Sequence, residues 1–205
     1  MMIASVLHLD RADMKALKIT DAYSLHRVVY DLYEDVRTEH EKKSDVPSGI
    51  LYADKGGDWN ARKILMLSNR APKNPGRGKI QSKEINDIFL QHDRYRFEVI
   101  VNPTKRDKAS GKTIAIRGRE LIAQWFIDKS EKAHGFRVRQ ESLQVNNTSV
   151  QIFEKKNNVV SQGSATIIGE LEVIERTRFI ESFKKGIGRG RAFGFGLLQI
   201  VPIIN

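Results

Sequence analysis

The stretch RYRFEVIVNPTK, residues 94–105, lies near the middle of the chain and marks the start of a second folding pattern. Phe97, Val99 and Val101 alternate with mostly polar neighbours, which is typical of a strand buried on one face. A basic loop around Ser110 and Gly111 follows, and residues 118–135, GRELIAQWFIDKSEKAHG, have the spacing of an amphipathic helix. We therefore expect a strand and a helix to begin a separate unit here.

The rest of this half continues with strands and one more helix. The inward face of the helix is predicted to hold Leu121, Ile122, Trp125 and Phe126, and Gly135 is its stop signal. Strands are predicted at 136–143, 148–153 and 165–174. RTRFIESFKKG predicts a short helix that ends at Gly186, and FGLLQIVPI predicts the last strand.

The first half of the chain is predicted to have a similar order of strands and helices. Residues 2–9 alternate as a strand, and a helix is predicted from about 21 to 40 with Thr20 or Asp21 as its N-cap. The apolar positions of this helix are Leu25, Val28, Val29, Leu32 and Val36. GILYAD and ARKILMLSN predict two strands joined by the turn KGGDWN. A basic loop rich in Pro and Gly follows, and then a weak helix or extended piece at 84–91.

Two rounds of strand–helix–strand–strand predict an α+β protein with two tandem ferredoxin-like (RRM-like) βαββαβ domains. We place the first domain at 1–92 and the second at 93–205. Such a unit has an open sheet face that RNA-recognition modules use as a platform, but the fold alone does not set the function.

Charge and composition narrow the class of partner. The 205 residues include 35 Lys and Arg against 25 Asp and Glu, a net charge of +10, which favours a polyanion such as nucleic acid. The chain has no cysteine, which excludes disulfides and thiolate metal sites and fits a reducing cytoplasm. The apolar run at the N-terminus is too short for a signal peptide or a membrane span, so we expect a cytoplasmic protein.

Candidate catalytic residues are few, because no P-loop, HExxH, GxSxG or paired-histidine metal spacing is present. We therefore expect no metal and no cofactor. His26 is distinctive among the five histidines, because Tyr23 and Tyr30 lie at i−3 and i+4 on the same helical face. A histidine there can transfer protons near neutral pH, or the stripe can simply pack against the sheet.

Basic residues form three clusters, each beside Gly or Pro. Together the three clusters favour one continuous binding surface for phosphates. The candidates in the central loop are Lys105, Arg106, Lys108, Lys112 and Arg117. The earlier loop supplies Lys73, Arg77 and Lys79. The stretch GIGRGRAFGFG supplies Gly188, Arg189, Gly190 and Arg191, and its glycines let the backbone turn and approach an anion closely.

Four stretches in order carry a resemblance to a known family: YSLHRVVY, FEVIVNPTKR, IAQWFIDKSEKAHGFRV and GELEVIERTRFIESFKKGIGRGRAFGFGLLQIVP. The chain resembles the CRISPR-associated endoribonucleases of the CasE type, which process precursor CRISPR RNA for Cascade-like complexes. The resemblance implies a metal-independent cut at the base of a repeat hairpin. The substrate's own 2′-OH attacks the adjacent phosphate and leaves a 2′,3′-cyclic phosphate and a 5′-OH.

The resemblance also implies roles for particular residues. The family's catalytic histidine and nearby tyrosine match His26 and Tyr23, and the hairpin 103–112 matches an element that binds the RNA stem. Lys155 and Lys156 match a region that supports the transition state in some members. The implied partners are precursor and mature CRISPR RNA and the other subunits of a Cascade-like complex.

Two other readings of the same sequence stay open. A repeat-associated RNA-binding subunit that does not cleave needs the same glycine-rich stretch and basic hairpin but does not need His26. A ribosome- or tRNA-associated RNA-binding protein would share the positive charge.

Overall fold

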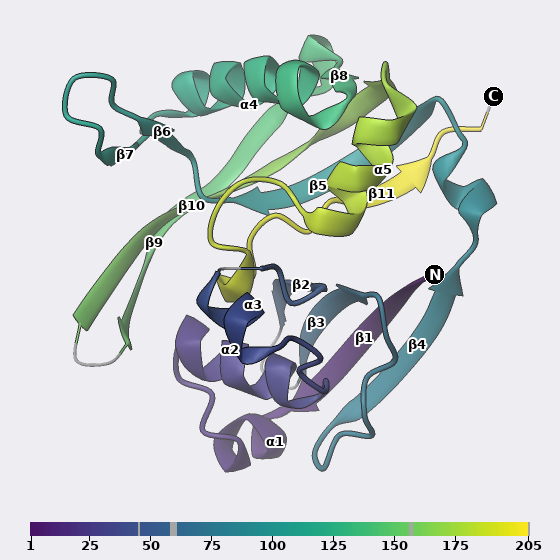
Figure 1. Ribbon diagram of the computed structural model, residues 1–205, viewed down its shortest axis with the longest axis vertical. Helices are drawn as coiled ribbons and strands as arrows, with labels where there is room; N and C mark the ends of the chain where they lie inside the picture. The colour runs from purple at the N-terminus through teal and green to yellow at the C-terminus, as the bar shows by residue number, and fades with distance from the viewer. Residues whose placement is uncertain (45, 58–60, 156–157, 205) are drawn as a thin grey trace.

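Two antiparallel sheets, one from each half of the chain, form the body of the protein, as seen in a computed structural model (Figure 1). The structure describes residues 1–44, 46–57, 61–155 and 158–204, with only the backbone of Lys155. The chain passes from the first sheet to the second through residues 86–93.

The first sheet has the strand order β2-β3-β1-β4, with every neighbouring pair antiparallel. Its strands are β1 (Met2–Asp10), β2 (Ile50–Gly57), β3 (Ala61–Ser68) and β4 (Lys79–Ile85). Its helices are α1 (Arg11–Ala16), α2 (Ala22–Asp31) and α3 (Glu39–Lys43). A loop with Pro72 and Pro75 takes the place of a second long helix between β3 and β4, since proline lacks the N–H that a helix interior needs.

The second sheet has the strand order β11-β5-β10-β8, and β9 extends from β10 as a long hairpin (Figure 1). Its strands are β5 (Arg94–Val101), β8 (Phe136–Val138), β9 (Gln144–Lys155), β10 (Asn158–Val173) and β11 (Gln199–Pro202). Its helices are α4 (Arg119–His134) and α5 (Arg176–Lys185). A separate ribbon is formed by β6 (Thr104–Arg106) and β7 (Thr113–Ala115). Short 3₁₀ turns lie at Asp87–Leu90, Gln140–Ser142 and Arg191–Phe193. The predicted fold class, α+β with tandem ferredoxin-like units, is confirmed.

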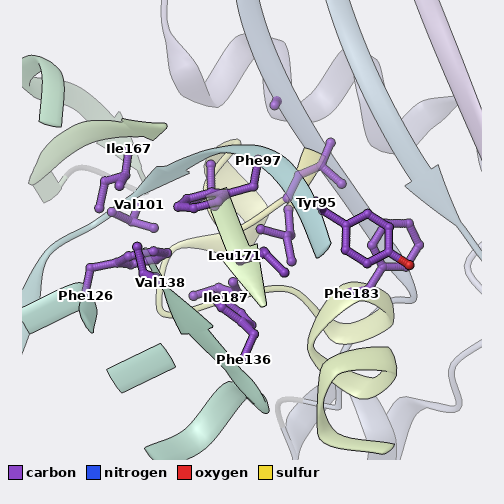
Figure 2. Packing of buried hydrophobic residues seen from close by; sticks show 14 of the residues in the cluster. Tyr95, Phe97, Val101, Phe126, Phe136, Val138, Ile167, Leu171, Phe183 and Ile187 are labelled. Carbon is purple, nitrogen blue, oxygen red and sulfur yellow. The ribbon is translucent and has the colours of Figure 1, made fainter. Parts of the chain in front are cut away.

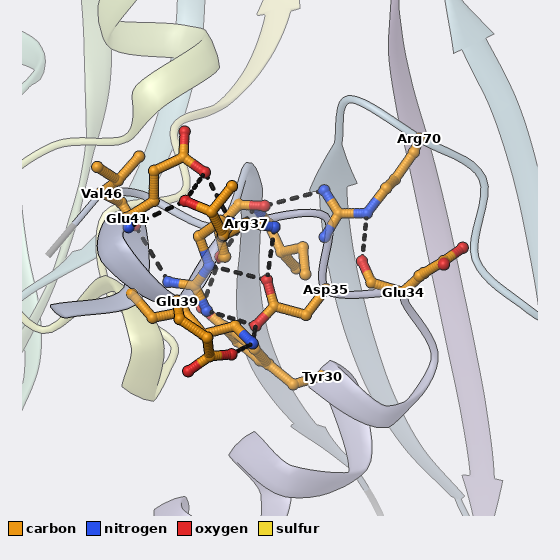
Figure 3. A network of polar contacts seen from close by, with 12 residues as sticks. Tyr30, Glu34, Asp35, Arg37, Glu39, Glu41, Val46 and Arg70 are labelled. Carbon is orange, nitrogen blue, oxygen red and sulfur yellow. Dashed lines mark hydrogen bonds and ion pairs between the residues drawn. The ribbon is translucent and has the colours of Figure 1, made fainter. Parts of the chain in front are cut away.

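The helix predicted from 21 to 40 is wrong in its length, because α2 ends at Asp31 and α3 is separate. Side-chain hydrogen bonds hold the intervening chain in a non-helical path. Arg37 binds the Asp35 carboxylate and the Val46 carbonyl, and Arg70 donates to the Glu34 carbonyl (Figure 3). As a result Val36, predicted to be on the apolar face, is 62% exposed.

Two further predictions are wrong, one in the burial of a side chain and one in the length of a strand. Leu121 is 65% exposed because it lies on the solvent side of α4, whereas Ile122 and Phe126 are buried as predicted. The weak helix or extended piece at 84–91 contains the end of β4 and a 3₁₀ turn. The strand predicted at 136–143 ends at Val138, because Gln140–Ser142 form a 3₁₀ turn. The strands predicted at 148–153 and 165–174 are confirmed as parts of the longer β9 and β10.

The larger hydrophobic core lies between the second sheet and its helices, where Phe97, Phe126 and Phe136 pack together (Figure 2). Leu51 and Leu67 of the first sheet belong to this same cluster, so the two sheets share buried surface. A hydrogen bond also connects α5 to the segment between the two sheets, because the Arg176 guanidinium donates to the Leu90 carbonyl at 3.0 Å. The shared core fixes the position of α2 relative to the chain around residue 190, where the candidate site lies.

Candidate active site

Helix α2 presents His26 at the boundary between the two halves of the chain. The Asp21 carboxylate caps this helix by accepting from the Ser24 amide at 2.7 Å, and Leu25 and Val29 are buried on the first sheet. His26 follows Leu25 around the helix and is therefore only half-buried, at the edge of that packed face.

Aromatic rings hold the His26 imidazole on several sides. The Tyr30 ring centroid lies 4.1 Å from that of His26, and the Phe193 centroid lies 5.5 Å away from the other half of the chain. The Tyr23 ring stacks at 6.1 Å. Tyr30 is itself fixed by a 3.1 Å hydrogen bond between its hydroxyl and that of Ser48. These contacts restrict the orientation of the imidazole.

The glycine-rich stretch closes on itself and packs against the first sheet. The Ile187 amide donates to the Gly196 carbonyl at 2.8 Å, and the Tyr52 hydroxyl donates to the Ala192 carbonyl at 3.1 Å. Gly190 has a φ of 77°, and a Cβ there would lie 2.6 Å from the Phe195 ring, so glycine is required for this path. The loop therefore brings the turn Arg191–Phe193 against α2 and β2.

A cleft of about 740 Å³ lies between α2 and this loop, and His26 and Tyr30 form part of its wall. The predicted residues Gly188, Arg189, Gly190 and Arg191 all line the same cleft. Arg37, Lys184, Lys185 and Phe193 also line it. Sequence reasoning did not single out these four, although the Lys184–Lys185 pair directly precedes the glycines at the end of a helix.

The cations of this cleft differ in whether a neighbouring carboxylate balances their charge. Arg37 forms an ion pair with Asp35 at 2.9 Å, which lowers the pKa of the Asp35 carboxyl to about 2 (Figure 3). Lys185 is 3.3 Å from the Glu181 carboxylate. Arg191, which is half-buried, donates to the Lys185 carbonyl at 2.7 Å, a contact that orients the guanidinium without cancelling its charge.

A second cleft, of about 910 Å³, opens on another side of His26. It is lined by part of α2 and by the loop before β4, including Lys73 and Arg77. The Lys73 amide donates to the Leu32 carbonyl at 2.6 Å, which ties this loop to the end of α2. Lys79 is exposed at the start of β4, beyond the residues that line this cleft.

The basic hairpin β6–β7 projects from the second sheet, away from the first (Figure 1). Its predicted RNA-binding side chains are all exposed: Lys105, Arg106, Lys108, Lys112 and Arg117. Arg189 connects the hairpin to the glycine-rich loop, because its guanidinium donates to the Thr113 hydroxyl at 2.6 Å. Lys129 of α4 lies near this junction, and its burial and the Arg189 charge lower its pKa. A positively charged path thus leads from the hairpin to the His26 cleft.

Three predicted catalytic residues are not part of this cleft as described. Tyr23 stacks near His26, but among the described lining residues the tyrosine is Tyr30. Lys155 ends β9, where only its backbone is described. Lys156 lies outside the described residues.

The described part of the chain contains no group of three His, Cys, Asp or Glu side chains placed to hold a metal ion. None of its helices has the length and apolar character needed to cross a membrane. What the cleft itself offers is an imidazole for proton transfer beside guanidinium groups that attract an anion.

Comparison with known proteins identifies the group to which this chain is related. The "CRISPR-associated endoribonuclease Cse3" of Thermus thermophilus is 29% identical over 130 residues, which cover 58% of this chain and 61% of that relative. A solved structure of Thermus thermophilus Cse3 bound to an RNA representing a pre-cleavage complex superimposes with a TM-score of 0.79 at 22% identity, covering 98% of this chain and 99% of that one. Cas6e from Escherichia coli gives a TM-score of 0.71 at 18% identity, covering 99% and 100%.

These two structures share the fold of this chain from end to end. The model of the family described as "CRISPR associated protein" matches residues 2–202, which is nearly the whole sequence. The chain therefore belongs to the family of CRISPR-associated proteins.

Proposed function

We propose that this protein is an endoribonuclease that cuts precursor CRISPR RNA at the base of the repeat hairpin and keeps the processed RNA bound. The observation that carries the proposal is the single cleft that is lined both by His26 of α2 and by Arg189 and Arg191 of the glycine-rich loop. A proton-transfer group beside cations suits cleavage of a phosphodiester. Membership in the CRISPR-associated family and the partial match to the Cse3 endoribonuclease give further support.

The proposed reaction is an attack by the RNA's own 2′-OH on the adjacent phosphorus. The O2′–P bond forms as the P–O5′ bond breaks, so the products are a 2′,3′-cyclic phosphate and a 5′-OH. One proton leaves the 2′-OH and one is delivered to the departing O5′. His26 performs one of these two transfers, and the aromatic rings of Tyr30 and Phe193 keep its imidazole in place.

We assign stabilisation of the negative charge on the phosphate oxygens to Arg191. Its guanidinium is oriented by a carbonyl, whereas Arg37 and Lys185 each lie beside a carboxylate. A fixed cation whose charge is not already balanced gives the larger stabilisation of a developing anion. The expectation that Lys155 and Lys156 support the transition state stays a prediction, because their side chains lie outside the described residues.

The hairpin β6–β7 and Arg189 would hold the RNA stem through its phosphates, since the deep major groove of an A-form duplex hides the base edges. Such contacts persist after the cut because they do not involve the broken bond. A processed RNA that stays bound would make the protein a subunit of the Cascade-like complex that uses this RNA.

Replacing His26 by Ala tests the assignment directly. We expect single-turnover cleavage of a labelled repeat-hairpin RNA to fall by about 10²- to 10⁴-fold, the usual contribution of one general acid or base. The affinity for the RNA should change little, because the phosphate contacts remain. Gel analysis of the cut and filter binding measure the two quantities on the same preparation.

The same assay with EDTA tests whether the reaction needs a metal. We expect equal rates with and without EDTA, since imidazole and guanidinium groups supply the chemistry in this proposal. Activity lost in EDTA and restored by a divalent ion would move the active site elsewhere. If the wild-type protein binds the hairpin tightly and produces no shorter RNA, it is a binding subunit instead.

A further inference from the structure

A third pocket, of about 410 Å³, shares the lining residue Phe193 with the His26 cleft. It is lined by residues from the start of α2, from β2 and β3, and from the hairpin of β9 and β10. Phe193 lines both this pocket and the cleft, so the two spaces are direct neighbours. The volume falls within the range of about 300–1,000 Å³ that is typical of small-ligand sites.

The charge of this pocket is opposite to that of the cleft. Its charged lining residues are Asp21, Asp54 and Arg62, which sum to −1. Arg62 pairs with Asp54, with its Nε 3.0 Å from a carboxylate oxygen, and the Asp21 carboxylate caps α2. A phosphate would meet a net repulsive field here, whereas the neighbouring cleft attracts it.

Neutral polar groups make up much of the remaining wall. They are the hydroxyls and amides of Asn147, Ser149, Gln151, Ser164 and Thr166, all from β9 and β10. The Gln151 amide oxygen is buried and has no hydrogen-bond partner in the described part of the chain. Buried polar groups are normally hydrogen-bonded, so this oxygen lacks a partner that an N–H donor of a ligand in the pocket would supply.

The other walls are apolar and aromatic. Phe193 is half-buried, and its ring packs against that of Phe153 with centroids 4.6 Å apart, which fixes its plane. Tyr52 and Ile100 complete this side. Aromatic rings together with neutral amides and hydroxyls are the groups with which proteins bind unstacked RNA bases.

We propose that this pocket binds one unpaired nucleobase of the RNA whose phosphate lies in the His26 cleft, with Gln151 accepting a hydrogen bond from the base. The proposal rests on the proposed function, because it takes RNA as the molecule in the cleft. The negatively charged pocket receives the neutral base, and the positively charged cleft receives the backbone. Phe193 separates the two and contacts both. Gln151 thereby becomes a residue that selects the nucleotide next to the cut.

The test measures binding of a repeat-hairpin RNA that cannot be cut, because the nucleotide at the base of the stem carries a 2′-deoxyribose. Each of the three nucleotides on either side of that point is made abasic in turn. Dissociation constants are measured for the wild type and for Gln151→Met, which keeps the volume of the side chain but removes the acceptor. We expect one abasic position to weaken wild-type binding about three- to tenfold.

The RNA that is abasic at that position should bind Gln151→Met as tightly as it binds the wild type, because the base and the acceptor form one interaction. Gln144→Met is the matched control, since Gln144 lies on the same strand outside the pocket and should behave as the wild type. Thr166→Val repeats the measurement within the pocket, and thermal melting checks that each variant folds.

The outcomes separate this inference from the proposed function. Two results would overturn the base pocket even if the all-ribose RNA is cleaved normally. One is that the affinity lost through Gln151→Met adds to the affinity lost at every abasic position. The other is that no abasic position changes the affinity. Failure of the wild type to cleave the all-ribose RNA would instead overturn the nuclease, while the coupling between base and Gln151 would still be read from binding.

Discussion

At the scale of single residues, the candidate site depends on how side-chain charges are balanced. Among the described residues, five cations line the His26 cleft: Arg37, Lys184, Lys185, Arg189 and Arg191. Arg37 and Lys185 have carboxylate partners, and Arg189 is directed to Thr113 of the hairpin. Arg191 combines partial burial with a neutral hydrogen-bond partner, so its charge acts within the cleft more strongly than that of an exposed side chain.

Replacing Arg191 by Ala should lower the single-turnover cleavage rate at saturating protein by about 10²- to 10³-fold, the typical effect of removing one fixed donor to a developing anion. Arg189→Ala is the matched control in the same loop. It should weaken RNA binding through a lost phosphate contact and leave the saturated rate nearly unchanged. Equal effects of the two variants on the saturated rate would count against a special role for Arg191.

At the scale of elements, the hairpin β6–β7 is an exposed ribbon whose turn is held by Asp107. Its carboxylate accepts from the Ser110 amide at 2.9 Å, and the hydrogen bonds from Ser110 lower the pKa of the Asp107 carboxyl. This contact does not involve Lys105, Lys108 or Lys112, so the charge of these lysines can be removed by mutation without breaking it. Arg106 also donates from its Nε to the Gly111 carbonyl at 3.2 Å, so thermal melting must check the fold of any variant that replaces it.

Replacing Lys105, Arg106, Lys108 and Lys112 together by Ala should weaken RNA binding and reduce its salt dependence. Each lost phosphate contact lowers the slope of log K against log salt by about 0.7 to 0.9. Filter binding over a range of salt concentrations measures that slope, and the cleavage rate at saturating protein should stay close to that of the wild type.

A control variant with Lys43, Lys63, Lys83 and Lys132 replaced by Ala changes the net charge equally at exposed positions that line neither cleft. It should keep the wild-type slope. If the slope of log K against log salt falls by the same amount in the control and in the hairpin variant, the hairpin contributes only to the overall charge of the protein.

At the scale of the whole molecule, the two sheets act together because they share a hydrophobic cluster and several polar contacts. Tyr52 of the first sheet binds the Ala192 carbonyl, and Lys55 forms an ion pair with Glu98 of the second. The proposed RNA path crosses this junction, from the hairpin over Arg189 to the cleft at α2. An RNA bound along this proposed path would contact both halves at once, which would slow its release.

With RNA in excess over protein, we therefore expect a burst of about one product per protein followed by very slow turnover. Quantifying the product against active protein measures the burst, and a chase with unlabelled product RNA measures release. Steady linear turnover without a burst would show that the product leaves freely and would remove the argument for a subunit that retains its RNA.

Much of the secondary structure of this protein could be predicted from residue patterns, because those patterns reflect local conformational and hydrophobic preferences. Alternation in FEVIV predicted β5, the apolar spacing of YSLHRVVY predicted α2, and Gly135 and Gly186 marked the ends of α4 and α5. The tandem ferredoxin-like arrangement followed from the order of these elements. Prediction failed at Leu121 and Val36, where apolar residue type is a poor guide to burial at the end of a helix or beyond it.

The candidate site needed the tertiary structure, because its parts lie more than 150 residues apart in the chain. His26 and the glycine-rich loop could each be named from sequence, but their meeting in one cleft depends on the core shared by the two sheets. The choice of Tyr30 beside His26 and of Arg191 among the cations depends on distances and ion pairs that no local pattern encodes. The pocket proposed to bind a base is likewise formed by strands from both halves, and its buried Gln151 oxygen is a property of packing and not of sequence spacing.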